Sequence, residues 1–172
     1  MAQLNQLIPN LKAQLPSEAQ WEYASRAGGY AIWKFGNNPK DGAGNVNIID
    51  ERLTVLATGQ VEDTLGHNDG WALHSPVDLY TPNAYGLYQM HGNVHEWCLD
   101  SYCVYSYPVR ARDGFRLGSI NNNDMRMFRG GAYCYSYEIS RTTSRRGTDA
   151  ASKNEMVGIR PIFMLPKQES SK

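Results

Sequence analysis

The sequence predicts one α+β domain that is rich in loops and short antiparallel strands. Its 172 residues match the size of a single domain with a real hydrophobic core. One segment near the N-terminus carries strong helix signals, whereas helix-forming residues are scarce after residue 30. The chain instead holds 16 glycines and 11 tyrosines, which are residues typical of turns and strands.

The best-marked helix is predicted to run from Ser17 to Ala27. Ser17 is a favourable N-cap, and Gln20 follows three residues later, which completes a capping box. Gly28-Gly29 supplies the backbone freedom with which helices often end. A shorter helix is predicted before it, since four apolar residues lie there at helical spacing and a proline limits its length. These residues are Leu4, Leu7, Ile8, Leu11 and Pro9.

The remainder of the chain shows no long periodic pattern. Residues 30–82 are expected to be ordered loop with short strands, because Trp33, Phe35 and Trp71 are unusual in a disordered segment. Further short strands are expected at Tyr85–Met90, Glu96–Ser101, Met127–Gly130 and Gly158–Met164, with a loop at Asp113–Asp124. The expected organisation is an N-terminal helix or extension at 1–14, one domain at 15–166 and a polar tail at 167–172.

Charge and hydropathy exclude several classes of protein. Lys+Arg and Asp+Glu number 17 each, so no basic surface for nucleic acid is expected. No apolar stretch is long enough to span a bilayer, and the first 15 residues lack the pattern of a signal peptide. Localisation therefore stays open, and display on a cell or virion surface would need another export route. The three cysteines allow one disulfide, most simply Cys98–Cys103, without requiring it.

The run from Asn83 to Trp97 is the most informative segment of the chain. It reads N-A-Y-G-L-Y-Q-M-H-G-N-V-H-E-W and combines turn residues with large apolar side chains. It resembles the signature N-x-x-G-L-x-D-M-x-G-N-V-x-E-W of the formylglycine-generating-enzyme (sulfatase-modifying factor) domain family. Two other segments, Leu15 to Arg26 and Phe128 to Tyr133 with its closing Val157 to Arg160, are similar to further motifs of that family, in the same order.

This resemblance implies a C-type-lectin-like fold and two sets of calcium ligands. The first set corresponds to Asn47, Ile48, Asp69 and Trp71, and the second to Gln89, Gly92, Val94 and Glu96. Such oxygen donors suit a hard cation with a structural role. Gln89 replaces the family's usual Asp, so the second set is expected to bind calcium more weakly or not at all. His91 and His95 lie in a turn-rich run and are expected to be packing or surface residues.

The family's best-known activity oxidises a substrate cysteine to formylglycine with copper held by two cysteines. Thiolates are the ligands that select Cu(I). In this chain Tyr135 and Ser140 stand at the two positions, and Cys134 lies one residue early. We therefore expect no copper and no oxidase activity. A degenerate relative with a structural role, or an active sulfatase-modifying-factor-like enzyme, remain as alternatives.

Another branch of this fold comprises the variable ligand-binding proteins of diversity-generating retroelements, whose hypervariable region lies near the C-terminus. Residues 128–160 match the position of that region. Exposed tyrosine and serine make adaptable contacts at low entropic cost. The alternative is that a tyrosine-rich strand buries one face. The predicted ligand-binding residues are Tyr133, Cys134, Tyr135, Ser136, Tyr137, Glu138, Ile139, Arg146, Asp149, Ala150 and Asn154.

The expected ligand of this non-catalytic protein is another protein or a cell-surface glycan. Fourteen residues precede Leu15, which is fewer than the family's domains carry there. Either the N-terminal part is reduced, or the chain is a truncated product, or another subunit supplies the missing surface. Since an incomplete sheet exposes an edge and apolar surface, we expect a homo-oligomer or a partner subunit.

Overall fold

A four-stranded sheet in the order β4-β3-β2-β5 lies at the centre of the molecule. Its strands are β2 (His95–Ser101), β3 (Met125–Arg129), β4 (Arg146–Asp149) and β5 (Val157–Gly158). Strand β3 pairs antiparallel with both β2 and β4, whereas β5 pairs parallel with β2. The computed structural model describes residues 1–8, 12–58, 66–116, 118 and 125–164, so the expected polar tail at 167–172 lies outside the described residues.

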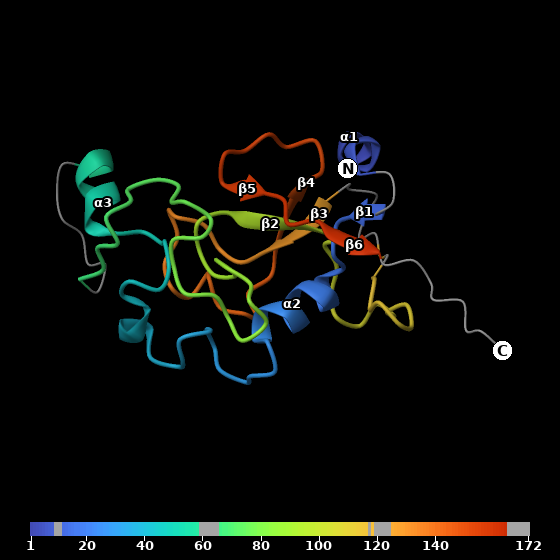
Figure 1. Cartoon of the computed structure of the whole chain (residues 1–172), viewed down its shortest axis with the longest axis horizontal. Coiled ribbons are helices and arrows are strands. Elements are labelled where there is room, and N and C mark those ends of the chain that lie inside the picture. The colour runs from blue at the N-terminus through green and yellow to red at the C-terminus, as the bar shows by residue number, and fades with distance from the viewer. Residues whose placement is uncertain (9–11, 59–65, 117, 119–124, 165–172) are drawn as a thin grey trace.

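The two ends of the described chain meet beside this sheet. Strand β1 (Lys12–Gln14) pairs antiparallel with β6 (Ile162–Met164), and helix α1 (Ala2–Leu7) lies next to them (Figure 1). Helix α3 (Glu51–Thr58) lies at the opposite end of the molecule, and a 3-10 turn, η1 (Pro39–Gly42), follows the loop after α2. The result is the loop-rich α+β architecture that the composition predicts.

Helix α2 (Glu18–Arg26) forms where the capping box predicted it. The Ser17 hydroxyl accepts the Gln20 amide, and the Gln20 side chain accepts the Ser17 amide at 2.8 Å. Ala27 then adopts a left-handed conformation with φ 46°, one residue before the predicted glycines. The helix buries Trp21, which packs against the sheet with Met90, Cys98 and Met127.

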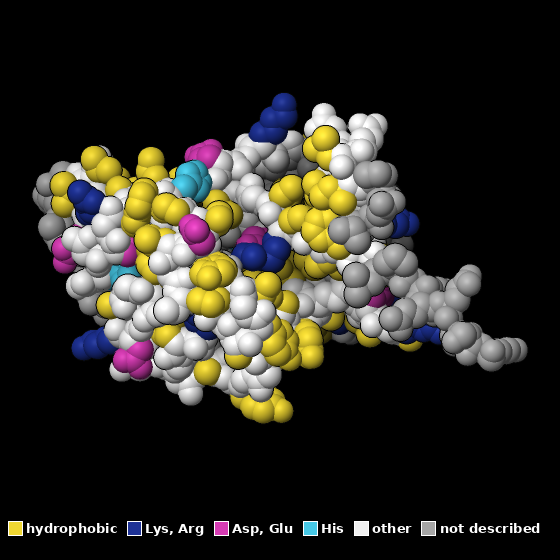
Figure 2. Space-filling view, in the orientation of Figure 1, with side chains coloured by type: hydrophobic (Ala, Val, Ile, Leu, Met, Phe, Trp, Pro, Cys, Tyr) yellow, Lys and Arg dark blue, Asp and Glu magenta, His cyan; other side chains and the backbone are white. Residues whose placement is uncertain are grey.

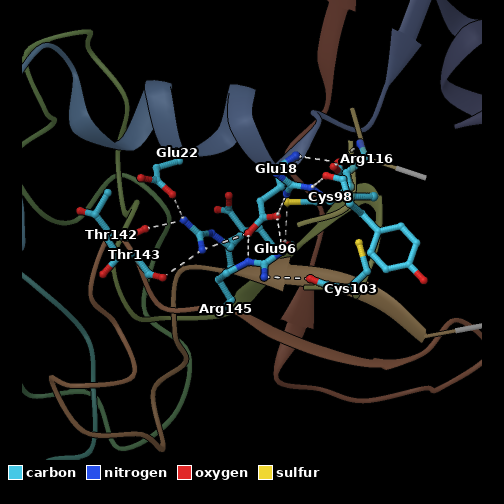
Figure 3. Close-up of polar contacts among 12 residues, drawn as sticks. Glu18, Glu22, Glu96, Cys98, Cys103, Arg116, Thr142, Thr143 and Arg145 are labelled. Atoms are coloured by element: carbon cyan, nitrogen blue, oxygen red, sulfur yellow. Dashed lines mark hydrogen bonds and ion pairs between the residues drawn. The ribbon is translucent and has the colours of Figure 1, made fainter. Parts of the chain in front are cut away.

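A buried charge network joins α2 to the sheet (Figure 3). Its members are Glu18, Glu22, Arg116, Arg129 and Arg145, and we call them the Glu18–Arg129 network. The Glu18 carboxylate accepts two bonds from Arg145, at 2.5 and 2.7 Å, and lies 3.3 Å from both other guanidinium groups. Arg129 also donates to the Thr142 carbonyl at 2.7 Å, so it anchors the loop that follows β3 as well.

The run from Asn83 to Trp97 is mostly a chain of turns that leads into β2. The Asn83 side chain accepts the amides of Tyr85 and Leu87 and donates to the Ala24 carbonyl at 2.7 Å. The strand predicted at Tyr85–Met90 is therefore wrong, because the Asn83 oxygen takes up amides that a ladder would need. Gly92 has φ +73°, and any Cβ there would collide with the Asn47 carbonyl oxygen.

Other elements differ from their predicted positions. Strands β2 and β3 agree with the prediction within two residues, and the strand predicted at Gly158–Met164 is replaced by β5 and β6. Helix α3 lies in a stretch that we expected to be loop with short strands. Asp50 caps it by accepting the Leu53 amide at 2.9 Å. The short strands β1 and β4 carry no periodic pattern and were not predicted, because pairing with distant strands defines them.

The face of the molecule drawn in Figure 2 carries no large charged patch. In Figure 2 the charged side chains of one face lie singly or in small groups among apolar and neutral ones. Within the described ranges, no helix has the length and apolar character needed to cross a membrane. All three cysteines are free thiols, so the optional Cys98–Cys103 disulfide is not formed.

Candidate functional site

The segment after β3 begins with a tight glycine turn. Gly130 and Gly131 both have positive φ, and a Cβ at Gly131 would lie 2.8 Å from the Ser140 Cα. This close approach brings the start and the end of the 133–140 segment together. The predicted contact residues from Tyr133 to Ile139 therefore lie in turns and not on a strand, whereas Arg146 and Asp149 lie on β4.

Tyr137 is a core residue, which makes its prediction as an exposed contact residue wrong. Its side chain packs with Trp33, Val46 and Ile48 and is only 4% exposed. The phenol oxygen lies 2.9 Å from His67 Nδ1. Burial raises the pKa of Tyr137 to about 12, so the hydroxyl stays protonated. Burial of part of this tyrosine-rich segment was the alternative considered above, but the segment forms turns and not the strand which that alternative assumed.

Tyr133 is also buried, so its predicted exposure is wrong too. Its amide donates to the Asn93 carbonyl at 2.9 Å, which holds the segment against the Asn83–Trp97 run. The ring packs on His74 with centroids 4.8 Å apart. His74 in turn bonds the Glu155 carbonyl at 2.8 Å, so it links two parts of the predicted contact region without having been assigned to it.

Tyr135 lies half-buried at the centre of the remaining predicted residues. Its ring centroid is 5.4 Å from that of buried His95 and 5.5 Å from the Arg146 guanidinium carbon. Its carbonyl accepts the Ile49 amide at 3.1 Å. The backbone is therefore fixed by distant segments, while one face of the ring is covered by an exposed arginine.

Cys134 and Ser136 extend this surface on either side of Tyr135. The Cys134 thiol donates to the Met156 sulfur at 3.0 Å, and the Met156 carbonyl accepts the His95 amide at 2.8 Å. Burial raises the pKa of the Cys134 thiol, so it stays protonated near neutral pH. The Ser136 hydroxyl donates to Glu138 at 2.5 Å, and this bond lowers the pKa of that carboxyl.

These contacts define one continuous patch, which we call the Tyr135 surface. It consists of Cys134, Tyr135, Ser136, Glu138, Arg146, Asn154 and Met156. Ile139 is partly exposed at its border. Asp149 and Ala150 are exposed as predicted, but Ala150 lines a different hollow with Leu15 and Trp97. The structure thus divides the predicted contact residues into a patch, its border, two buried tyrosines and the exposed pair Asp149 and Ala150 outside the patch.

The two positions that would carry copper-binding cysteines lie in unlike surroundings. Tyr135 belongs to the surface just described. Ser140 is fully buried, its hydroxyl donates to the Tyr137 carbonyl at 3.0 Å, and its carbonyl lies 2.8 Å from His91 Nδ1. Cys98 and Cys103 are buried, and burial raises the pKa of both thiols. No pair of thiols faces a common space at the Tyr135 surface.

The first predicted calcium set contains an unsatisfied buried oxygen. The Asn47 amide nitrogen donates to the Leu73 carbonyl at 2.8 Å, which orients its oxygen away from that bond. Asn47 Oδ1 is buried and has no hydrogen-bond partner among the described residues. Asp69 accepts the Trp71 amide and the Tyr80 hydroxyl, each at 2.7 Å. An unpaired buried amide oxygen and a buried carboxylate are both donors that suit a hard cation.

Two further polar atoms near this set were not predicted from the sequence. Asp50 Oδ2 and His67 Nε2 are buried without a hydrogen-bond partner in the part of the chain that the structure describes. His67 Nε2 lies 3.8 Å from Asp69 Oδ2. Asp50 also contributes to raising the pKa of Tyr80, although burial of the phenol is the larger cause. No sequence signal marks Asp50, since an Asp before a helix is usually only a cap.

The second predicted set fits a cation poorly. Both oxygens of Glu96 accept bonds from Arg160, and Oε2 also accepts the Trp21 indole N–H at 2.7 Å. Gln89 donates its amide to the Ser75 hydroxyl at 3.1 Å and to the Pro76 carbonyl. Gly92 and Val94 lie between them in the turns before β2. The carboxylate that a cation would need is already neutralised.

Comparisons with known proteins agree with this fold. The formylglycine-generating enzyme of Mus musculus is 32% identical over 150 residues, which cover 82% of this chain and 37% of the relative. The inactive Cα-formylglycine-generating enzyme 2 of Bos taurus is 29% identical over 154 residues, which cover 86% of this chain and 42% of the relative. The chain thus spans about two fifths of the length of these curated relatives.

Two solved structures share the fold at 23% sequence identity. Treponema denticola variable protein 1 superposes with a TM-score of 0.68 over 90% of this chain and 48% of that chain. PvdO from Pseudomonas aeruginosa superposes with a TM-score of 0.73 over 95% of this chain and 57% of that chain. At this identity both likenesses show the fold alone. A family model, however, matches residues 6–164, and the chain therefore belongs to the sulfatase-modifying factor enzyme 1-like domain family.

Proposed function

We propose that this domain is a non-catalytic ligand-binding protein that uses the Tyr135 surface. The observation that carries the proposal is the placement of Tyr135 itself. It stands where the oxidase's first cysteine would lie, and it presents a half-exposed aromatic ring between His95 and Arg146. The second cysteine position, Ser140, is buried in backbone hydrogen bonds. This arrangement supports binding and provides no pair of thiolates for copper.

The ligand that fits this surface is a protein or a cell-surface glycan. The patch combines an aromatic ring, a guanidinium, a carboxylate and a hydroxyl on a fixed backbone, which is the mixture that adaptable binding surfaces use. It is exposed rather than enclosed, so it suits a large partner better than a small metabolite. We further propose that residues 128–160 are hypervariable, as in the variable proteins of diversity-generating retroelements.

The gene's neighbourhood is the most direct test of the variable-protein proposal. A reverse transcriptase beside a near-copy of the segment that encodes residues 128–160, with differences only at adenines, is the expected finding. The expected variable positions are the exposed side chains of the Tyr135 surface and its border. Substitutions concentrated instead at buried Tyr133 and Tyr137 would contradict the proposal, since each would disturb the core.

The relatives favour one competing function, the copper-dependent oxidation of a cysteine to formylglycine. Its test is incubation of the chain with Cu(I), oxygen and a cysteine-containing sulfatase peptide, followed by mass spectrometry. We expect no formylglycine, because the only thiol near the site is the protonated Cys134 beside Met156. Any product that depends on this chain and on copper would establish the enzyme and exclude the non-catalytic proposal.

We also propose that the first oxygen set binds calcium as a structural ion. The residues that would hold it are Asn47 and Asp69, with the carbonyls of Ile48 and Trp71. An ion that binds only the folded state at one hundred times its dissociation constant stabilises it by about 2.7 kcal/mol. We therefore expect chelation to lower the melting temperature of the wild-type chain and to have little effect on Asn47→Ala. Equal melting with calcium and with chelator would exclude this site.

Exposed apolar side chains support a further proposal, self-association or packing on a partner subunit. Leu56, Leu73, Val77 and Ile159 are each more than half exposed. Such side chains are common at protein interfaces when they are contiguous. Light scattering at high concentration is expected to give a mass above that of one chain, and a clean monomer would contradict the homo-oligomer.

A further inference from the structure

We propose that the guanidinium of Arg160 takes the place of the cation in the second oxygen set, so that this set does not bind calcium. The proposal concerns the Glu96 site and does not depend on the proposed binding function. It implies that the turns before β2 are held by an ion pair within the chain, whereas the first oxygen set is left as the metal-dependent part of the fold.

Arg160 engages both oxygens of the Glu96 carboxylate. Its Nε lies 3.1 Å from Oε1 and 2.9 Å from Oε2, and its Nη2 lies 2.7 Å from Oε1. Glu96 is only 5% exposed, and a buried carboxylate needs a compensating charge and hydrogen bonds. The planar guanidinium supplies both, since its fork matches the geometry of a carboxylate.

The same guanidinium also binds a carbonyl oxygen of the second set's loop. Its Nη2 lies 2.8 Å from the Tyr88 carbonyl, one residue before Gln89. A hard cation at this place would be expected to be coordinated by a carboxylate and by main-chain carbonyls. Arg160 therefore makes the two kinds of contact that a bound ion would make, from a residue that belongs to the chain itself.

The remaining donors reinforce the exclusion of a cation. Gln89 is neutral, and its amide nitrogen is already bonded to the Pro76 carbonyl and the Ser75 hydroxyl. Glu96 and Arg160 together carry no net charge, so a divalent ion added between them would meet an uncompensated positive group. Asp78, the other acidic residue that lines the adjoining hollow of about 370 Å³, is exposed at its rim.

Trp21 makes the proposal directly measurable with terbium, a luminescent substitute for calcium. Its indole nitrogen lies 2.7 Å from Glu96 Oε2, so a terbium ion on Glu96 would accept excitation energy from this ring. Trp71 would report the first set in the same way. The experiment therefore uses full-length Asn47→Ala, in which the first set is disabled, as the background for all measurements.

In that background we expect no saturable tryptophan-sensitised terbium emission below 1 mM. Adding Arg160→Gln and Gln89→Asp removes the resident guanidinium and restores a carboxylate, so we expect saturable emission with at least tenfold tighter binding. Arg141→Gln, which removes an exposed guanidinium elsewhere, is the matched control and should leave emission unchanged. Circular dichroism confirms that each variant is folded.

Two results would overturn the proposal. One is saturable emission below 1 mM with Arg160 intact that disappears in Glu96→Gln. The other is a folded Arg160→Gln/Gln89→Asp variant that gains no binding, since Arg160 would then not be what excludes the ion. Equilibrium dialysis of the unmodified chain against calcium provides a check that needs no variant. At most one ion per chain is expected, and two would contradict the proposal.

Discussion

The Glu18–Arg129 network and the Tyr135 surface are adjacent in the chain at Arg145 and Arg146, yet they are built in opposite ways. In the network, side chains carry the interactions: Arg129 is fully buried and bonds Glu22 at 2.5 Å and the Thr142 carbonyl at 2.7 Å. In the Tyr135 surface, the main chain carries them, and the side chains contact mainly one another. The first arrangement fixes residue identity, whereas the second fixes only backbone position.

Main-chain bonds from distant segments hold the surface in place. The Asn93 carbonyl accepts the Tyr133 amide at 2.9 Å, the Ile49 amide donates to Tyr135 at 3.1 Å, and His91 lies 2.8 Å from the Ser140 carbonyl. None of these bonds depends on the side chain of residue 134, 135 or 136. A segment held in this way tolerates exchange of its exposed side chains, which is what a variable binding surface requires.

The sharpest test of this contrast is Arg129→Met. It leaves two glutamates without their shared buried partner, so we expect a loss of about 3–5 kcal/mol in the free energy of unfolding. Arg146→Met, on the exposed side of the Tyr135 surface, is the matched control and should change stability by about 0.5 kcal/mol or less. Urea denaturation monitored by tryptophan fluorescence measures both. Similar losses of stability in the two variants would show that the network and the Tyr135 surface do not differ in this way.

Tyr137 tests where the boundary between the two regions lies. Because its ring is part of the core, Tyr137→Ala should cost about 3 kcal/mol of stability. Tyr137→Phe removes only the hydroxyl near His67 Nδ1 and should cost about 1 kcal/mol. The measurement is again urea denaturation. If Tyr137→Ala kept the stability of the wild-type chain but bound the ligand more weakly, Tyr137 would belong to the contact surface after all.

Acid should lower the stability of the fold because it protonates the buried side chains of His91 and His95. Burial lowers the pKa of each to about 4, whereas the unfolded value is 6.5. The unfolded chain therefore binds more protons between these values, so stability is complete above pH 6.5 and falls as the pH drops towards 4. At pH 5 we expect a loss of roughly 2 kcal/mol for each histidine. His95→Gln should reduce the difference in urea midpoint between pH 7.5 and pH 5, and an unchanged difference would show that His95 does not contribute.

The smallest expected effect on stability, and the most specific for function, comes from Tyr135→Ala. Its ring is half-exposed, so stability should fall by about 1 kcal/mol or less. Because the Tyr135 ring is the aromatic centre of the patch, the substitution should weaken the free energy of ligand binding by about 2 kcal/mol. An array of cell-surface glycans and purified surface proteins, probed with the wild-type chain, Tyr135→Ala and Tyr30→Ala, measures this. Tyr30 is 96% exposed and lies outside the patch, so equal losses in both variants would place the site elsewhere.

Local signals were predicted well, and contacts between distant residues were not. The capping box of α2 involves residues three apart, so the sequence alone contains it. The Asn83 oxygen turns a predicted strand into a turn, and the Asn83 amide nitrogen donates to the Ala24 carbonyl, 59 residues away in sequence. The burial of Tyr137 depends on Trp33, and the closed Glu96 site depends on Arg160. Neither pairing can be deduced from spacing along the chain.

The sequence by itself determined the family, the α+β class and the best helix, and it places Tyr and Ser at positions 135 and 140. These properties depend on residue type and on order along the chain. Only the tertiary structure decided which tyrosines are exposed, which oxygens lack partners and which charge neutralises Glu96. The physical reason is that burial and ion pairing depend on distances between residues that the chain brings together from far apart.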